Sequence, residues 1–484
     1  MTKTQSLKEK TAKGLMWGGL NNGIQQVLNL VFGIFLARLL SPHDYGMVGM
    51  LAIFSAMASA LQESGFTMAL ANKKTVESKD YNAVFWFSTL TGLAIYIVLF
   101  ICAPLIADFY QQPELVWLSR YVFLGFLLSS TGIAHNAVIY RNLLIKQKAI
   151  AQMTALVISG IAGVTMAFNG MAYWGIATQS ILYVGVANGL YWRFSRWSPT
   201  LHIDFTPLRG MFVFSSKLLL TNLFNVANNN IFSVLLGRFY STAEVGFYTQ
   251  ASKWHLMGYS TINNTINGIS QPILARVSED RERQLRIFRK MLRFTAFLAF
   301  PAMFGLALVA RELIVITITE KWLPCVIILQ ILCIWGAFYP INSLYSYLLI
   351  SKGKSNVYMW NTIGLGLLQV LTMIICCHLG IIVMLLLYVS INIAWLGLWH
   401  YFVQREIGLT WWQSFTDIAP FTLAALVTIG LTWWITLPIE SPALMMTAKI
   451  LIAASIYCII MIIFKVQVFK DTVEYLRKIL PINS

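Results

Sequence analysis

Residues 20–46 read LNNGIQQVLNLVFGIFLARLLSPHDYG, and residues 220–246 read LTNLFNVANNNIFSVLLGRFYSTAEVG. The second stretch repeats the first without a gap, since eight of the 27 positions are identical, where chance would give roughly two. Each stretch is a long apolar run that ends in a short polar turn, the pattern of a membrane-spanning helix and the turn after it. Internal duplication of spans is typical of transporters that open alternately to two sides. The identical pairs are Leu20/Leu220, Asn22/Asn222, Asn29/Asn229, Phe32/Phe232, Leu36/Leu236, Arg38/Arg238, Ser41/Ser241 and Gly46/Gly246.

The composition of the whole chain agrees with a membrane protein. Of 484 residues, 58% are hydrophobic and only 11% are charged, whereas soluble domains carry about 25% charged residues. We therefore predict an all-α polytopic protein with about 14 transmembrane helices, each formed by an apolar run of about 20 residues. The expected spans are residues 15–37, 46–71, 83–107, 116–139, 150–169, 171–192, 211–236, 246–273, 294–318, 323–350, 357–378, 380–401, 416–437 and 446–464.

The position of the repeat divides these spans into lobes. We predict an N-terminal lobe of six spans in residues 1–200 and a C-terminal lobe of six spans in residues 201–403. Two further spans and a cytoplasmic amphipathic tail would occupy residues 404–484. Because six is an even number, both lobes would have the same orientation, related by a pseudo-twofold axis along the membrane normal. A basic amphipathic helix is expected at 277–293, lying on the cytoplasmic surface.

Charge placement predicts the orientation. With the N-terminus inside, 27 of the 35 Lys and Arg residues fall in cytoplasmic segments, as the positive-inside rule requires. We expect a multi-pass protein of the bacterial cytoplasmic membrane with both termini in the cytoplasm. The net charge of +16 follows from this topology and from attraction to anionic lipids, so no nucleic-acid partner is expected.

No enzyme and no bound cofactor are expected. The six cysteines lie in or beside apolar runs without metal-ligand spacing, so they are interpreted as buried small residues. The outer connections are too short to build an extramembrane active site.

Amide side chains form a row on each of the two duplicated spans. In the first span they are spaced by three and four residues, which places them on one helical face, and the seventh span repeats the arrangement. Polar groups in a bilayer usually face a wet cavity or a neighbouring helix. The two rows are interpreted as walls of one substrate path, and hydrogen bonding between packed helices is the alternative. The rows are Asn22, Gln25, Gln26 and Asn29, and Asn222, Asn225, Asn228 and Asn229.

Charged residues within the spans are a second group of candidates. Lys217 in the seventh span is predicted to contact an anionic cargo, with snorkelling to the inner surface as the alternative. Lys253 and Arg120 lie near the outer ends of their spans, where snorkelling is the commoner role. Glu63 in the second span would bind a proton or Na⁺, or form a structural ion pair. His135 is interpreted as a packing residue, with proton relay as the alternative.

The duplicated turns are expected at the outer mouth of the path. Arg38 and Arg238 would border the exit, where they meet either the cargo phosphate or lipid headgroups. Gly46 and Gly246 are interpreted as allowing a tight chain reversal between two spans. A cationic, amide-lined path suits a phosphorylated cargo, because basic groups make charge-assisted hydrogen bonds to phosphate.

The residues of these turns also resemble a known family. The run from Ala37 to Gly46, with Ser64-Gly65-Phe66, resembles the amino-terminal signature of the polysaccharide flippases of the multidrug/oligosaccharidyl-lipid/polysaccharide exporter superfamily. Residues 235–251 resemble its mid-chain signature, and the overall pattern is most similar to the Wzx and WzxC branch. The resemblance implies two six-helix lobes across a cavity, with two additional helices. It also implies an undecaprenyl-pyrophosphate-linked oligosaccharide as cargo, moved to the outer leaflet for exopolysaccharide, capsule, lipopolysaccharide or O-antigen assembly, with other polysaccharide assembly proteins as partners.

One departure from that family concerns ion coupling. Many relatives have an acid within an Asn-x-Asp pattern before the glycine that corresponds to Gly237. Here Asn230 keeps the amide, but Phe232 stands where the acid is expected. Glu63 therefore becomes the candidate for coupling transport to H⁺ or Na⁺.

Three other functions are weighed against this one. A multidrug exporter of the same superfamily would be expected to have acidic residues in its cavity, and a lipid II flippase several arginines within the first two spans. A polymerase or a lipid-dependent glycosyltransferase would need a large outer loop. The sequence favours export of lipid-linked oligosaccharide by alternating access over all three.

Overall fold

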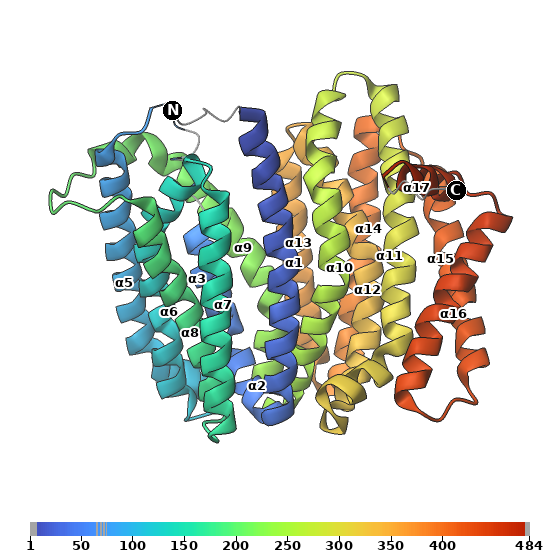
Figure 1. The fold of residues 1–484 in the computed structure, drawn as a ribbon, viewed down its shortest axis with the longest axis horizontal. Coiled ribbons are helices and arrows are strands. Elements are labelled where there is room, and N and C mark those ends of the chain that lie inside the picture. Colours follow the sequence, from blue (N-terminus) through green and yellow to red (C-terminus); the bar gives the residue numbers. More distant parts are fainter. Residues whose placement is uncertain (1–6, 64–65, 68–69, 71–72, 74, 480–484) are drawn as a thin grey trace. The chain divides into compact units, whose positions relative to one another are not determined.

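The structure is a computed structural model that describes residues 7–63, 66–67, 70, 73 and 75–479. Side chains are described from residue 21 onward, except at 62–63, 210–215, 217–218, 221, 269, 473 and 475–479. Every regular element in these residues is a helix (Figure 1). The chain divides into two compact units, residues 1–246 and 247–484.

The helices of the first unit are α1 (Leu7–Leu39), α2 (Pro42–Met50), α3 (Ala52–Glu63), α5 (Ser78–Tyr110), α6 (Leu115–Arg141), α7 (Ile145–Phe168), α8 (Tyr173–Ser195), the short η1 (Thr206–Leu208) and α9 (Arg209–Phe239). Helix α10 (Thr242–Arg276) begins in the first unit and continues in the second. The second unit then contains α11 (Arg281–Ile318), η2 (Glu320–Trp322), α12 (Pro324–Ser351), α13 (Ser355–Cys376), η3 (Cys377–Leu379), α14 (Ile381–Ile407), α15 (Trp411–Thr436), α16 (Pro442–Ile463) and α17 (Gln467–Ile479).

Within the described residues, each of the fourteen predicted spans coincides with helical structure. The second span is the pair α2 and α3, which bends by 47°. Among the described residues, nine helices are long and apolar enough to cross a membrane, and the number is ten if this bent pair counts as one span. Helices α1, α8, α9 and α10 have similar lengths but a more polar composition. The chain is therefore a multi-pass membrane protein, and three of these four more polar helices carry the amide rows described below.

Helix α6 contacts α3, α5 and α8 in the first unit (Figure 1). Phe123 on α6 is fully buried and meets the ring of Phe54 on α3, with 5.0 Å between the ring centroids. Helix α1 packs on α7, and α9 packs on α3. Helix α9 thus belongs by its contacts to the first unit, and the lobe boundary at residue 200 stays a prediction.

Helix α11 is the centre of the second unit, in contact with α12, α15 and α16. The expected surface helix at 277–293 is wrong as a separate element, because residues from Arg281 onward form the first turns of α11. The side chain of Asp280 accepts a hydrogen bond from the Arg283 N–H at 2.9 Å and caps the helix there. Phe288 is fully buried and stacks on Tyr345 of α12. This stretch is amphipathic because one side packs on α12.

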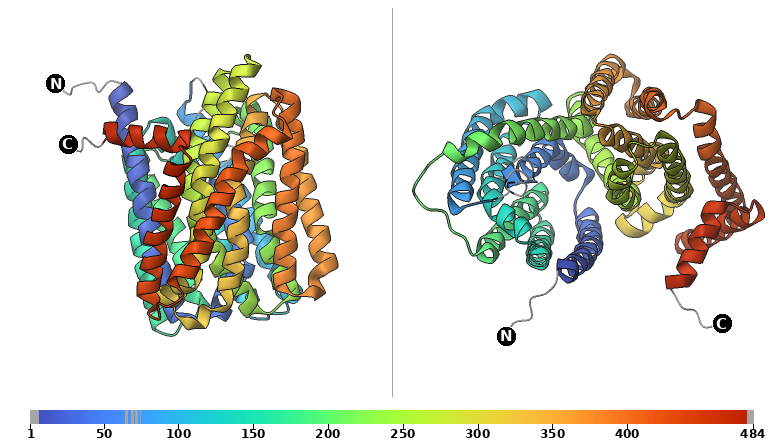
Figure 2. Two further views of the ribbon diagram at one scale, coloured as in Figure 1. Left: turned by 90° about the vertical axis from the view of Figure 1, so that its right-hand side faces the viewer. Right: turned by 90° about the horizontal axis from the view of Figure 1, so that it is seen from above.

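Helix α17 lies across the end of the second unit, whereas α15 and α16 run along it (Figure 2). Lys290 on α11 donates a hydrogen bond to Asp471 on α17 at 3.1 Å, and this bond holds the pKa of the carboxyl group below its usual range. The interfacial position of this tail stays a prediction.

Two ion pairs, each with a buried carboxylate, attach the last two spans to α11. Near its start, Arg289 donates two hydrogen bonds to Asp417 on α15, at 2.7 and 3.0 Å. Near its end, Glu312 pairs with Lys449 on α16 at 2.8 Å. Removing one member of a buried pair leaves a charge without compensation, which costs about 3–5 kcal/mol when both members are buried. These pairs therefore fix the positions of α15 and α16 along α11.

A candidate substrate path on the duplicated spans

Three amides of the first predicted row lie on the exposed side of α1. Asn22, Gln26 and Asn29 are all exposed, and their spacing of four and three residues places them on one face. Within the described part of the chain, the side chains of these three residues make no hydrogen bond to another residue. An uncompensated amide in hydrocarbon costs several kcal/mol. This face is therefore suited to water or to a polar ligand.

Gln25 belongs instead to the packed side of α1. Its amide nitrogen donates to Asn21 at 2.9 Å and to Gln152 on α7 at 3.2 Å. Asn21 is buried and also donates to Gln152, at 3.1 Å. These three amides hold α1 on α7, so the packing alternative holds for Gln25.

The amides on α9 show a similar division. Asn229 is exposed, and Asn222 and Asn225 are half-buried. Asn230, which follows Asn229, donates to the carbonyl of Val226 on the same helix at 2.8 Å. Asn229 and Asn230 thus differ in environment although they are adjacent in sequence.

A third polar row, which the sequence interpretation missed, runs along α10. One face of this helix carries Lys253, Ser260, Asn264, Asn267 and Gln271, whose successive spacings are seven, four, three and four residues. Asn264 and Gln271 are exposed, and Lys253 is half-buried. The same periodicity that revealed the rows on α1 and α9 would have revealed this one. Lys253 is therefore part of a polar face.

The two duplicated turns have the same local structure. The Oγ atom of Ser41 accepts from the Asp44 N–H at 3.2 Å, and the Asp44 carboxylate accepts from the Ser41 N–H at 2.8 Å. Ser241 and Glu244 form the same reciprocal pair, at 3.3 and 2.9 Å. This capping box satisfies the free N–H groups at the start of α2 and α10. The repeat is thus preserved in hydrogen bonding as well as in sequence.

The two turns also pack directly on each other within the first unit. A Cβ atom on Gly46 would overlap the carbonyl oxygen of Thr242, and a Cβ atom on Gly246 would overlap the carbonyl oxygen of Pro42. Both glycines lie inside helices with ordinary backbone angles. The predicted role in chain reversal is therefore wrong, because the absence of a side chain serves close approach of two helix starts.

The side chains of both turn arginines are exposed. Arg238 is exposed, donates to the Phe109 carbonyl on α5 at 2.8 Å and lies over the Phe109 ring. Arg38 is exposed as well. Arg120 donates to the Phe100 carbonyl at 3.3 Å and lies over the rings of Phe100 and Trp117.

Two predicted residues lie outside the described side chains. Glu63 ends α3 and Lys217 lies in α9, but their side chains are outside the described set. The sequence interpretation treated Glu63 as the remaining carboxylate within the spans, and it missed Glu312 and Asp417. Both are buried and paired with cations. His135 is buried, contacts Ser195 Oγ through Nδ1 at 2.9 Å and stacks on Trp192.

Comparison with known proteins identifies the family of this chain. Residues 35–327, which contain both duplicated turns, match the family described as polysaccharide biosynthesis protein. The chain belongs to the polysaccharide biosynthesis protein family. It is 24% identical over 358 residues to the lipopolysaccharide biosynthesis protein WzxC of Escherichia coli (strain K12), covering 73% of this chain and 72% of WzxC. It is also 24% identical over 378 residues to the teichuronic acid biosynthesis protein TuaB of Bacillus subtilis (strain 168), covering 78% of each.

Solved structures show the same fold. The lipid II flippase MurJ in an inward closed conformation matches with a TM-score of 0.76 at 16% identity, covering 95% of this chain and 100% of MurJ. An inward-facing multidrug resistance MATE family transporter matches with a TM-score of 0.61 at 15% identity, covering 84% of this chain and 95% of that one. The predicted all-α polytopic fold is therefore confirmed.

Proposed function

We propose that this protein moves a lipid-linked oligosaccharide, built on undecaprenyl pyrophosphate, from the inner to the outer leaflet of the bacterial cytoplasmic membrane. The observation that carries the proposal is the exposed amide row on α1, with Asn229 on α9 as its counterpart in the repeat. Amide side chains are uncharged and both donate and accept hydrogen bonds, so they match the hydroxyl groups of sugars. The family and the names of WzxC and TuaB support a polysaccharide precursor as cargo.

The mechanism that fits a duplicated membrane protein is alternating access. The matched capping boxes and the mutual packing of Gly46 and Gly246 support repeated elements that act as a pair. The lobes would be residues 1–200 and 201–403, with both termini in the cytoplasm. Lys217 and Lys253 are the proposed contacts for the pyrophosphate, and Glu63 is the proposed site for H⁺ or Na⁺ coupling.

The charges of the described residues argue against a cationic drug as cargo. Three carboxylates are buried, and each lies within 2.8 Å of a cation: Asp80 with Lys73, Glu312 with Lys449, and Asp417 with Arg289. A cationic ligand would have to displace one of these cations. No observation favours a lipid II flippase beyond a shared fold.

The neighbouring amides Asn229 and Asn230 provide a matched test. The purified protein is reconstituted in vesicles with a fluorescent undecaprenyl-pyrophosphate oligosaccharide, and the lipid that becomes accessible to an external quencher is measured. We expect Asn229→Ala to slow transport about ten-fold, which corresponds to the loss of roughly one hydrogen bond of 1.4 kcal/mol. Asn230→Ala should transport at the wild-type rate, because Asn230 bonds its own helix. Equal rates for both variants would contradict the assignment of this face to the path.

A further inference from the structure

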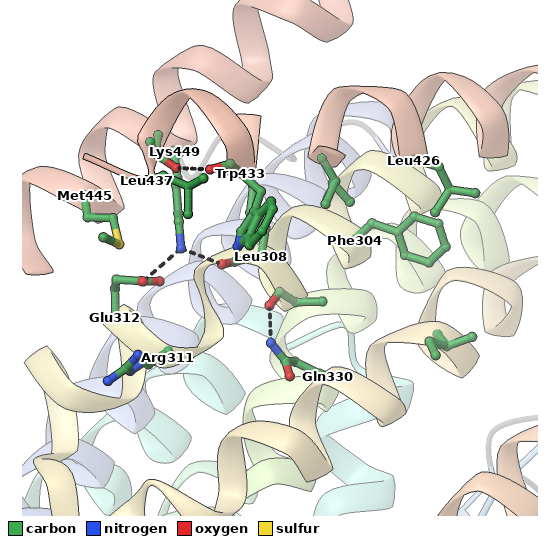
Figure 3. A pocket seen from close by; sticks show the side chains of 14 residues that line it. Phe304, Leu308, Arg311, Glu312, Gln330, Leu426, Trp433, Leu437, Met445 and Lys449 are labelled. Atoms are coloured by element: carbon green, nitrogen blue, oxygen red, sulfur yellow. Dashed lines mark hydrogen bonds and ion pairs between the residues drawn. The ribbon is translucent and has the colours of Figure 1, made fainter. Parts of the chain in front are cut away.

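A cavity with charged and apolar walls lies within the second unit, between α11 and α12 on one side and α15 and α16 on the other. Its volume is about 730 Å³, in the range of small-molecule sites. The lining residues come from the C-terminal halves of α11 and α15 and the N-terminal halves of α12 and α16. Figure 3 shows their side chains. Leu426 and Trp433 on α15, and Leu437 directly after that helix, are 51%, 55% and 53% exposed. The cavity therefore opens on the side of the unit that would face lipid.

Three charged side chains line this cavity. Lys449 pairs with Glu312 at 2.8 Å, and it also donates to the Leu308 carbonyl at 3.2 Å. Arg311 lies beside Glu312 (Figure 3), is exposed and has no ion pair within the described residues. Two cations and one carboxylate leave the lining with one net positive charge. A ligand with a single negative charge would neutralise it.

One oxygen of the pair has no donor. Glu312 is only 5% exposed, and its Oε2 atom has no hydrogen-bond partner among the described residues. A buried acceptor without a donor is costly, more so when it carries charge. Because Glu312 lines the cavity, a donor group held there would satisfy Oε2 while Lys449 stays bonded to Oε1. A hydroxyl group would supply it without adding charge.

The remaining walls are apolar. Phe304, Ile334 and Ile429 line the cavity with Leu426 and Met445. Such walls would bury hydrocarbon, and the open side toward the bilayer lets a chain leave without crossing polar groups. A free water-soluble anion would leave this apolar surface uncovered.

We propose that this cavity holds an anionic glycerophospholipid of the surrounding bilayer, with its phosphodiester against Arg311 and a headgroup hydroxyl on Glu312. Phosphatidylglycerol has this chemistry, because it carries one negative charge and two headgroup hydroxyl groups. A choline headgroup has no donor for Glu312 Oε2, and an ethanolamine headgroup brings a compensating positive charge. The lipid would sit where α16 meets α11, so it would strengthen the attachment of the last two spans. The site is separate from the amide rows.

Native mass spectrometry of the purified full-length protein tests this assignment. The protein in detergent is titrated with palmitoyl-oleoyl phosphatidylglycerol, phosphatidylethanolamine or phosphatidylcholine. We expect phosphatidylglycerol to be retained at about ten-fold lower concentration than phosphatidylcholine, the effect of roughly one charge-assisted hydrogen bond. Arg311→Gln should remove this preference. Arg286→Gln is the matched control, because Arg286 is an exposed arginine near the opposite end of the same helix.

A second pair of variants tests the position of the lipid. Met445 lines the cavity and Met446 does not, so Met445→Trp should fill the space and abolish phosphatidylglycerol retention, while Met446→Trp should leave it unchanged. Equal retention of phosphatidylglycerol and phosphatidylcholine by the wild-type protein would overturn the proposal. A preference for phosphatidylethanolamine, or equal effects of Arg311→Gln and Arg286→Gln, would overturn it as well.

Discussion

The contact between the duplicated turns predicts that Gly46 cannot be replaced by alanine without loss of stability. Gly46 lies in α2, and a Cβ atom there would overlap the Thr242 carbonyl oxygen at the start of α10. That oxygen belongs to the backbone, so no side-chain rotation relieves the overlap. The start of one of the two helices has to move.

The size of the effect follows from two opposing terms. Overpacking of one carbon atom costs about 1–3 kcal/mol, whereas alanine is preferred to glycine within a helix by about 1 kcal/mol. Because the overlap is with backbone, the first term should lie in the upper half of its range. We expect a net loss of about 1–2 kcal/mol. Gly246→Ala should have a similar effect through Pro42, and the double variant should cost less than the sum because both sites share one contact.

The assay is thermal unfolding of the purified full-length protein, followed by tryptophan fluorescence at one heating rate. Gly125→Ala is the control, since Gly125 is also in a helix and nothing lies within 4 Å of its Cβ position. We expect Gly46→Ala to lower the unfolding temperature by a few degrees, and Gly125→Ala to leave it unchanged or raise it. An equal or higher unfolding temperature for Gly46→Ala, matching Gly125→Ala, would refute the close packing of the two turns.

Two further predictions concern charged residues. Asp417→Asn should destabilise the protein by about 1–3 kcal/mol, because it leaves the partly exposed Arg289 without its buried partner. Glu406→Gln is the control, since it disrupts a more exposed ion pair with Lys354 at 3.6 Å and should change stability by less than about 0.5 kcal/mol. Equal unfolding temperatures for the two variants would contradict a structural role for Asp417. Arg238→Gln should leave the rate of vesicle transport within about two-fold of wild type, because Arg238 binds the Phe109 carbonyl. If this variant unfolds at the wild-type temperature but does not transport, Arg238 contacts the cargo instead.

The nine apolar spans found among the described residues could be predicted from the sequence because a bilayer requires long apolar helices. Helices α1, α8, α9 and α10 are more polar, so hydropathy alone does not give the number of spans. The start of α11 was the exception, since its charged residues looked like a surface segment. Asp280 was the available signal, because an aspartate just before a helical pattern is a typical N-cap.

The ion pairs could not be predicted in the same way. Glu312 and Lys449 are 137 residues apart, and each lies near a helix end where a charge normally reaches water. Only the packing of α16 on α11 brings them together. The amide rows were partly predictable: helical spacing selected Asn22, Gln26 and Asn29, but it could not separate them from Gln25, which a neighbouring helix engages.

The central claim is that this protein moves a lipid-linked oligosaccharide across a bilayer, and its transport rate in vesicles is the most direct measurement. Vesicles with purified wild-type protein, and vesicles with none, receive a fluorescent undecaprenyl-pyrophosphate oligosaccharide in both leaflets, and an external quencher reports the protected fraction. We predict that the protected fraction falls from about half toward zero only in the vesicles that contain the protein. A protected fraction that stays the same with and without protein, for every oligosaccharide offered, would contradict the account.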